Sequence, residues 1–304
     1  MENKTKYKQL LQKHAIPLFY QDWYLDIVCD GEWDVVFDER VRQITGFWVY
    51  MLKQKFLLRY IVPPQFCPYT GFYSLDSRFS QQSFDSLKSK LPSHQLLIQK
   101  MHPTIQIETG FKESSERTYI ISKNENIDDL WENLSSDYKR KIRKADRHLS
   151  IKESDDFEAF YRFINNAFKE RKQEVYYDQK IFQRIDRSLA KRNQRKIYVA
   201  MSEEGKIMAG LYLMSDDLTN YNFVNAVQAG NHYGMYLLIW KMIEKSLKEG
   251  KAFDFEGSKI DGVENFYRRF GGERIDYKTI YKSGGSLIDA VVKLKNPNLT
   301  WKSG

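Results

Sequence analysis

The sequence predicts an α+β protein built from two lobes. Its 304 residues exceed one ordinary domain and fit two domains of about 150 residues, each large enough to bury a core. The predicted elements run helix, antiparallel strands, helix, strands, and a similar order returns in the second half of the chain. Because helices and strands do not alternate strictly, a doubly wound parallel sheet is not expected.

The first lobe is predicted to span residues 1–130. A helix is expected at 22–30, followed by strands rich in β-branched and aromatic residues at 33–37, 44–53 and 56–62. Pro63 and Pro64 interrupt the sheet. A helix at 80–90 and strands at 94–100, 105–107 and 117–122 are expected to complete the lobe.

A long helix is predicted from Ile127 to Leu149, at the boundary between the lobes. Its apolar residues recur at intervals of three or four: Leu134, Tyr138, Ile142, Ala145 and Leu149. The other positions carry a dense basic run: Lys139, Arg140, Lys141, Arg143, Lys144 and Arg147. Such a face suits RNA phosphate, and it equally suits an ordinary solvated surface over an apolar stripe.

The second lobe is predicted to span residues 131–292, with a tail at 293–304. Helices are expected at 155–172 and 179–192, and then a three-stranded meander at 196–201, 207–214 and 220–226. A strong helix follows at 231–248, then a strand at 252–255, a short helix at 263–270 and a last strand at 273–281.

Composition narrows the class of protein. A chain that is 42% hydrophobic and 29% charged is globular, and its net charge of +8 favours anionic partners such as CoA, tRNA or an acidic membrane surface. The two cysteines, Cys29 and Cys67, form no CxxC pair, so we expect no disulfide framework and no metal site. No apolar run approaches the roughly 20 residues of a membrane span. We therefore predict a cytoplasmic protein for which a monomer is plausible.

Three segments carry a resemblance to a known family. Residues 254–258 (DFEGS) and 262–272 (GVENFYRRFGG) resemble the DFxGS…FKxxFGG signature of FemAB-like proteins. The basic stretch at 134–145 resembles the helix that precedes their second lobe, and 17–26 resembles the opening of their first lobe. The element order over 155–283 is also that of the GNAT superfamily. The chain thus resembles the FemAB-like branch, which implies two tandem GNAT-like lobes with mixed, mostly antiparallel sheets flanked by helices.

The resemblance implies an N-acyltransferase. We expect it to move an acyl group from acyl-CoA to an amine, either an amino sugar or a peptide, by direct attack in a ternary complex. No Ser/His/Asp or Cys/His set argues for a covalent intermediate. An aminoacyl-tRNA donor is the first alternative, and a catalytically degenerate ligand-binding module is the second. Two departures from the family bear on this choice: Tyr267 replaces a frequent Lys, and the glycine-rich Q/RxxGxG/A loop is absent at 228–234.

The start of the helix at 231–248 is the predicted site for the donor. Unpaired backbone N–H groups and the helix dipole favour phosphate there, although Asn231 also suits an ordinary helix cap. The predicted donor-binding residues are Asn231, His232, Tyr233 and Gly234.

Further side chains of the second lobe are predicted to carry the chemistry. Glu256 follows a short apolar strand and can take a proton from the amine, or simply bind the next turn. Tyr267 can protonate the leaving group, and the backbone N–H groups at 225–227 can polarise the carbonyl. The predicted substrate-binding residues are Tyr221, Asn225, Arg268 and Arg269.

Overall fold

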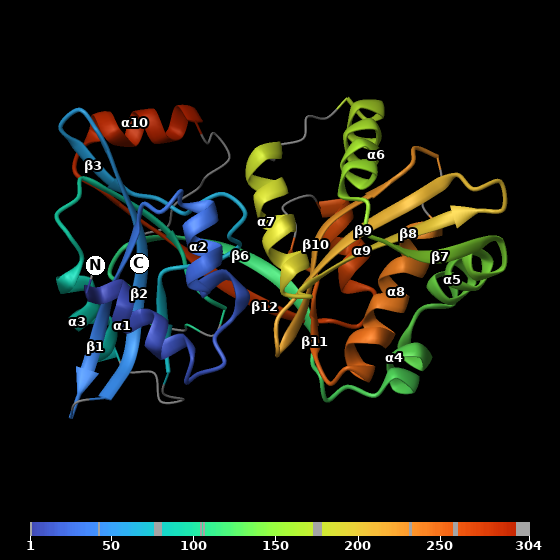
Figure 1. Cartoon of the computed structure of the whole chain (residues 1–304), viewed down its shortest axis with the longest axis horizontal. Helices are drawn as coiled ribbons and strands as arrows, with labels where there is room; N and C mark the ends of the chain where they lie inside the picture. The colour runs from blue at the N-terminus through green and yellow to red at the C-terminus, as the bar shows by residue number, and fades with distance from the viewer. Residues whose placement is uncertain are drawn as a thin grey trace. The chain divides into compact units, whose positions relative to one another are not determined.

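The computed structural model describes residues 2–41, 43–75, 81–103, 105, 107–172, 178–230, 233–257 and 261–295. The chain forms two compact units: Met1–Arg117 together with Asp276–Gly304, and Thr118–Ile275 (Figure 1). This division differs from the predicted lobe limits of 1–130 and 131–292. The reason is that β12 (Glu273–Ser283) begins in the second unit and pairs with β5 (Leu96–Lys100) of the first unit, which takes the C-terminal segment with it.

The sheet of the first unit has the order β1-β2-β3-β5-β12-β6, with β4 paired to β2. Both types of pairing occur, since β1–β2 and β2–β3 are antiparallel and β3–β5 is parallel. Besides β5 and β12, the elements are α1 (Glu2–Leu11), η1 (Leu18–Tyr20), α2 (Asp22–Val28), β1 (Trp33–Arg40), β2 (Gln43–Lys55), β3 (Leu58–Ile61), β4 (Phe72–Ser74), α3 (Gln81–Lys90), β6 (Lys112–Ile121) and α10 (Ser286–Lys295).

Several features of this unit differ from the sequence prediction. Helices α1 and α10 and strand β4 were not predicted. A strand was expected at 105–107, but Ile105 and Ile107 lie outside any strand, and residue 106 lies outside the described residues. Ile105 is buried, as its apolar character requires, but its N–H closes a turn on the carbonyl of His102. The apolar character of Ile105 therefore predicts its burial correctly. Strand formation depends in addition on a neighbouring strand, which the local sequence does not reveal.

The second unit is a mixed sheet with the order β6-β11-β10-β9-β8-β7, in which β10 and β11 are parallel and the other neighbours antiparallel. Together with the predicted helices, this confirms the α+β class. The elements are α4 (Ile127–Asn133), α5 (Ser136–His148), β7 (Leu149–Ser154), α6 (Phe157–Glu170), α7 (Gln179–Lys191), β8 (Arg195–Ser202), β9 (Ile207–Ser215), β10 (Thr219–Val227), α8 (Tyr233–Lys248), β11 (Ala252–Asp254) and α9 (Asp261–Arg268).

The single helix predicted from Ile127 to Leu149 is wrong, because the chain forms two helices there. Leu134 leaves the helical conformation at φ −63° and ψ 141°, and the Oγ of Ser135 then accepts the N–H of Tyr138 as the cap of α5. Leu134 is buried although it lies outside both helices, which explains why it fits the apolar spacing of the predicted helix. Leu149 starts a strand, β7, that was not predicted.

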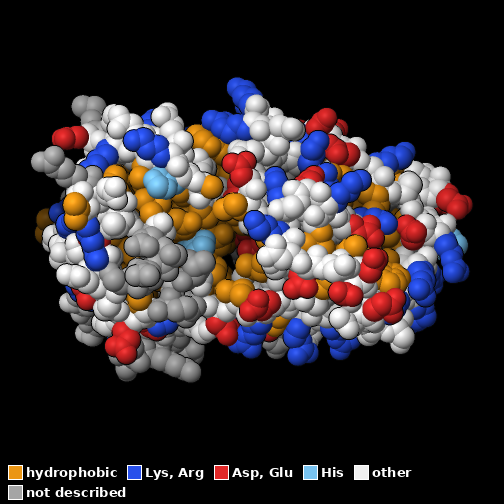
Figure 2. All heavy atoms as spheres, turned by 90° about the horizontal axis from the view of Figure 1, so that it is seen from below, with side chains coloured by type: hydrophobic (Ala, Val, Ile, Leu, Met, Phe, Trp, Pro, Cys, Tyr) orange, Lys and Arg blue, Asp and Glu red, His pale blue; other side chains and the backbone are white. Residues whose placement is uncertain are grey.

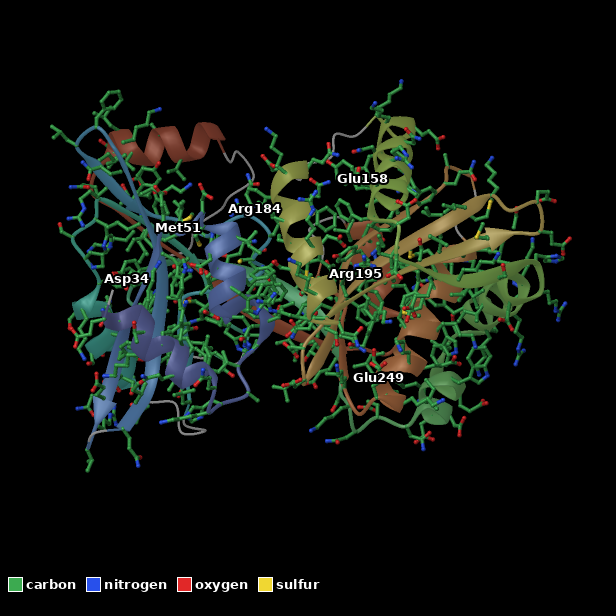
Figure 3. All side chains as sticks on the ribbon, in the orientation of Figure 1. Asp34, Met51, Glu158, Arg184, Arg195 and Glu249 are labelled. Atoms are coloured by element: carbon green, nitrogen blue, oxygen red, sulfur yellow. The ribbon has the colours of Figure 1, made fainter. Side chains whose placement is uncertain are left out.

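Helices cover both faces of the second sheet. On one face α4, α5, α8 and α9 share a core with the strands, including Ile142, Leu211 and Trp240. On the other face α6 and α7 bring Phe157 and Phe182 to within 6.4 and 5.1 Å of the Tyr212 ring centre. The buried Arg195 guanidinium, 3.0 Å from the Asp186 carboxylate, lies at the start of β8 below these helices (Figure 3). The site described next belongs to the α8/α9 face.

Candidate active site

The parallel pairing of β10 with β11 ends early and leaves a strand edge open. It covers only three pairs, from Thr219↔Ala252 to Tyr221↔Asp254. Strand β11 stops at Asp254, but β10 continues to Val227 on its other neighbour, β9. Beyond Tyr221, no strand of the described residues pairs with β10 on this side, although Arg171 Nη2 donates to the Val227 carbonyl at 2.7 Å. The backbone N–H and C=O groups of such an edge can bind an extended ligand that contains amides.

A β-bulge turns two asparagines of β10 toward the same face. Asn222 is opposite Leu213 and Asn225 is opposite Leu211, while Phe223 is the extra residue of the bulge. In a regular strand, residues three apart point to opposite faces. The extra residue restores the phase, so both amides point to the α8/α9 face, where Leu211 and Leu213 also lie.

Both amides bind the hydroxyl of Tyr267, which α9 supplies. The Nδ2 of Asn225 lies 2.9 Å from Tyr267 Oη and the Nδ2 of Asn222 lies 3.2 Å from it. Asn225 Nδ2 also donates to Asn222 Oδ1 at 3.0 Å, which locks the two amides together. Because Tyr267 Oη accepts both N–H groups, its own proton is left to donate, and no described residue accepts it.

The pKa of Tyr267 reflects this setting. Burial raises it above its ordinary value of 10.0, and the hydrogen bonds from Asn225 and Asn222 oppose the rise. Only 5% of the residue is exposed. The phenol is therefore protonated at neutral pH and serves as a neutral hydrogen-bond donor.

The end of β11 is held by Asp254. Its Oδ1 accepts the Thr118 hydroxyl at 2.6 Å and the Glu256 N–H at 2.8 Å. Burial raises the Asp254 pKa to about 6. Glu256 and Gly257 both have positive φ, of 61° and 64°, so the chain turns sharply at this point. The turn sets the position of Glu256, while Ser258 of the predicted motif lies outside the described residues.

The predicted donor site at the start of α8 is described only in part. Asn231 and His232 lie outside the described residues. The ring of Tyr233 lies 4.6 Å from the Nζ of Lys144. A Cβ on Gly234 would stand 3.1 Å from the Cβ of Ala209, so this glycine lets α8 pack closely on the sheet.

The remaining predicted substrate residues lie apart from one another. Tyr221 is buried, and its hydroxyl donates to Asp216 Oδ2 at 2.7 Å. Arg268 and Arg269 are exposed at the end of α9. Arg268 donates to Asn265 Oδ1, while the charge of Arg269 acts on Tyr138, so the two guanidiniums face different surroundings. The structure thus brings together Tyr267 and Asn225, and adds Asn222.

The basic helix α5 is partly neutralised within the second unit. Lys139 pairs with Glu132, and Arg140 and Lys141 both pair with Asp137. On the face shown in Figure 2, acidic side chains are interspersed with Lys and Arg over much of the surface. The net charge of +8 is therefore not concentrated into one uniform basic patch on this face.

A separate hollow of about 720 Å³ lies between α4, α5 and α8. Trp131 and Trp240 line it, with their ring centres 5.1 Å apart. Arg143 and Glu244 also line it. None of the residues of the Tyr267 network lines this hollow, so we do not assign the chemistry to it.

Sequence reasoning missed Asn222 and Thr118. The only signal for Asn222 was its spacing of three from Asn225, which for a regular strand argues against a shared face. Thr118 is separated from Asp254 by most of the lobe, and only the pairing of β6 with β11 brings them together.

Comparisons with known proteins agree with this architecture. Residues 133–278 match the family model "Acetyltransferase (GNAT) domain". The structure is similar to that of FemX, with a TM-score of 0.64 and 11% identity, over 91% of this chain and 95% of that one. It is also similar to L-PGS from Bacillus licheniformis, with a TM-score of 0.58 and 12% identity, over 95% of each chain. No curated protein matches the sequence.

At 11% and 12% identity, the two structures show only that the fold is similar. The family model shows which kind of domain residues 133–278 match. None of the described helices is long and apolar enough to cross a membrane. Residues 133–278 accordingly match a GNAT acetyltransferase domain, and the whole chain has a fold similar to that of FemX.

Proposed function

We propose that the protein transfers an acyl group from acyl-CoA to an amine, which is an amino sugar or a peptide. The observation that carries the proposal is the Tyr267 hydroxyl, held by two amides at the β10 bulge with its proton free to donate. The open edge of β10 lies along the same strand. In this proposal the Tyr267 hydroxyl donates to the thioester, and the open edge of β10 binds the amides of the pantetheine arm.

In the proposed reaction the amine nitrogen attacks the thioester carbon, so a C–N bond forms and the C–S bond breaks. Backbone N–H groups at 225–227 polarise the carbonyl oxygen, and Glu256 accepts the proton that the amine loses. The Tyr267 pKa is raised above 10.0, whereas an ordinary thiol has a pKa of about 8.5. Full proton transfer to the sulfur is therefore unfavourable, and Tyr267 acts mainly as a hydrogen-bond donor to the departing thiolate.

The remaining predicted residues are assigned to binding. Asn231, His232, Tyr233 and Gly234 at the start of α8 are proposed to hold the donor's diphosphate through backbone N–H groups. Arg268 and Arg269 are proposed to bind anionic groups of the substrates. Tyr221 stays in the proposal only as a support of the strand, because its hydroxyl is bound to Asp216. We assign the reaction to the cytoplasm, a reducing compartment that suits two buried cysteines, Cys29 and Cys67, which form no disulfide.

An aminoacyl-tRNA donor is the second candidate, and one observation favours it. Lys144 and Arg147 are exposed on α5 and have no carboxylate partner among the described residues. Lys144 also lies over the ring of Tyr233, at the start of α8. A phosphate backbone could follow these charges to the proposed donor site.

The experiment compares donors with the purified protein. Acetyl-CoA is supplied with an amino sugar or a peptide amine and thiol release is followed; charged tRNA is supplied in parallel. We expect thiol release that requires the amine and falls in Glu256→Gln. Consumption of charged tRNA alone, lost in Lys144→Gln/Arg147→Gln and in high salt, would establish the second candidate instead. If neither donor reacts while an acceptor still binds, the protein is a ligand-binding module.

A further inference from the structure

Three large apolar side chains stand out of one end of the first unit. Phe56 and Leu57, 87% and 93% exposed, form the turn between β2 and β3, and Leu287, in the first turn of α10, is 83% exposed. Among the described residues, only two other large hydrophobic side chains are exposed, Val41 and Leu218. Exposed apolar side chains that gather in one place mark an interaction site more often than scattered ones do.

Strand register places these side chains at the same end of the sheet. Gln95, just before β5, accepts the N–H of Gly284 at 2.7 Å and donates its own N–H to the carbonyl of Arg59 at 2.8 Å. Arg59 is two residues from Leu57, and Gly284 is three residues from Leu287. Figure 1 shows the β2–β3 turn beside the first turn of α10.

The turn is built to keep its apolar side chains outward. Lys55 pairs with Leu58, so only Phe56 and Leu57 remain in the turn. Phe56 adopts a φ of 54°, a conformation that bulky residues rarely adopt, and its carbonyl accepts Gln54 Nε2 at 3.0 Å. The backbone conformation of Phe56 costs free energy, and burial of its ring does not offset this cost because the ring is exposed.

Basic side chains surround this tip. Lys55 is the last residue of β2, directly before the turn. Burial, and then the charges of Lys282 and Arg59, lower the pKa of His94, so both cations lie near this histidine. The segments 53–62, 92–100 and 282–288 contain no Asp or Glu. The nearest carboxylate along α10, that of Asp289, binds the Tyr281 hydroxyl. The tip is therefore apolar at its centre and positive at its rim.

We propose that this tip docks the protein on an anionic lipid bilayer, with Phe56, Leu57 and Leu287 in the interface and the basic rim among the headgroups. A stable protein partner usually covers about 800 Å² of each surface, which a convex two-residue turn does not offer. A bilayer accepts apolar side chains of any shape, and its negative headgroups match the rim.

The test measures flotation of the full chain with vesicles of phosphatidylcholine mixed with phosphatidylglycerol, and with phosphatidylcholine alone. We expect binding to the anionic vesicles that weakens with salt. Phe56→Ser/Leu57→Ser should reduce it about tenfold or more, because two apolar side chains leave the interface. Lys55→Gln/Arg59→Gln should reduce it about fivefold per charge. The matched control is Val41→Ser, at the exposed β1–β2 turn of the same unit, which should bind like wild type.

Three results would overturn the proposal. The first is equal vesicle binding by wild type and Phe56→Ser/Leu57→Ser, and the second is an equal loss of binding in Val41→Ser. The third is the absence of vesicle binding by wild type; if Phe56→Ser/Leu57→Ser then abolishes self-association in sedimentation, the tip is an interface between copies of the chain. None of these positions belongs to the proposed active site, so acyl transfer without vesicles should be unchanged in every variant.

Discussion

Two buried tyrosines, Tyr7 of the first unit and Tyr267 of the second, use their hydroxyls in opposite ways. In the first unit, Tyr7 donates its hydroxyl to the carbonyl of Tyr20 at 2.7 Å, within an aromatic cluster that also holds Phe47 and Tyr73. In the second unit, the Tyr267 hydroxyl accepts two side-chain amides and keeps its proton. The single proton of the Tyr7 hydroxyl is engaged in a hydrogen bond to the backbone, so it is not available to a ligand. The Tyr267 hydroxyl accepts two hydrogen bonds, so it can still donate its proton to a ligand.

The surroundings of two other buried side chains, His102 in the first unit and Asp254 in the second, differ in a similar way. His102 in the first unit lies among aromatic rings, 4.6 Å from the centre of Tyr69, and burial lowers its pKa to about 3. Asp254 in the second unit lies at a strand end beside the open edge of β10. In the first unit the His102 side chain lies within an aromatic core, whereas in the second Asp254 lies beside the open edge of β10.

The strongest test of this comparison removes the hydroxyls of Tyr267 and Tyr7, one at a time. Tyr267→Phe should lower kcat of the proposed transfer about a hundredfold, because it deletes the donor to the departing thiolate. Tyr7→Phe deletes an equally buried hydroxyl and should lower the free energy of unfolding by about 1 kcal/mol with kcat unchanged. Steady-state thiol release and chemical denaturation measure the two effects. Equal activity of Tyr267→Phe and wild type would remove Tyr267 from the mechanism.

Acid should weaken the first unit through His102. Its folded pKa of about 3 lies below the ordinary value of 6.5, so its stabilising contribution is complete above pH 6.5 and is lost as the pH falls. Between pH 7 and pH 5 this amounts to about 2 kcal/mol. Calorimetry at the two pH values should show a destabilised transition that His102→Gln makes less sensitive to pH. An unchanged pH dependence in the variant would mean that another group titrates.

Close packing of α8 gives a further test of the second unit. Gly234→Val should lower the free energy of unfolding by about 1–2 kcal/mol, because the new Cβ meets Ala209, Leu149 and Ala200 within 3.5 Å. Gly262→Ala in α9 is the control, since nothing lies within 4 Å of its Cβ, and it should be neutral or slightly stabilising. Thermal denaturation of both variants decides the point. Wild-type stability of Gly234→Val would show that α8 can move away from the sheet.

The smallest expected effect has the opposite sign to that of His102. The Asp254 pKa is raised to about 6 from 3.8, so the folded state holds more protons than the unfolded state in this range. The contribution of Asp254 to stability is therefore largest at low pH and falls as the pH rises through 6. Between pH 5 and pH 7 the loss is about 1 kcal/mol, and Asp254→Asn should abolish it. Calorimetry of this variant at both pH values would expose an error if the difference persisted.

The sequence by itself determined the class of the fold and most of its elements. Periodicity located α6, α7 and α8 and the meander β8–β9–β10, because amphipathic helices and strands bury one face wherever they pack. The motif also singled out Tyr267 and Glu256, whose catalytic roles stay predictions, and the GNAT family model matches the segment to which both belong.

Only the tertiary structure decided how the site is built. The break at Leu134 depends on a cap by Ser135, and the division of the chain depends on β12 pairing with β5. The shared face of Asn222 and Asn225 depends on one extra residue in β10, which reverses the alternation that a regular strand would give. The β12–β5 pairing joins segments that are far apart along the chain, whereas the cap and the bulge are local choices of backbone conformation that an amphipathic pattern does not specify.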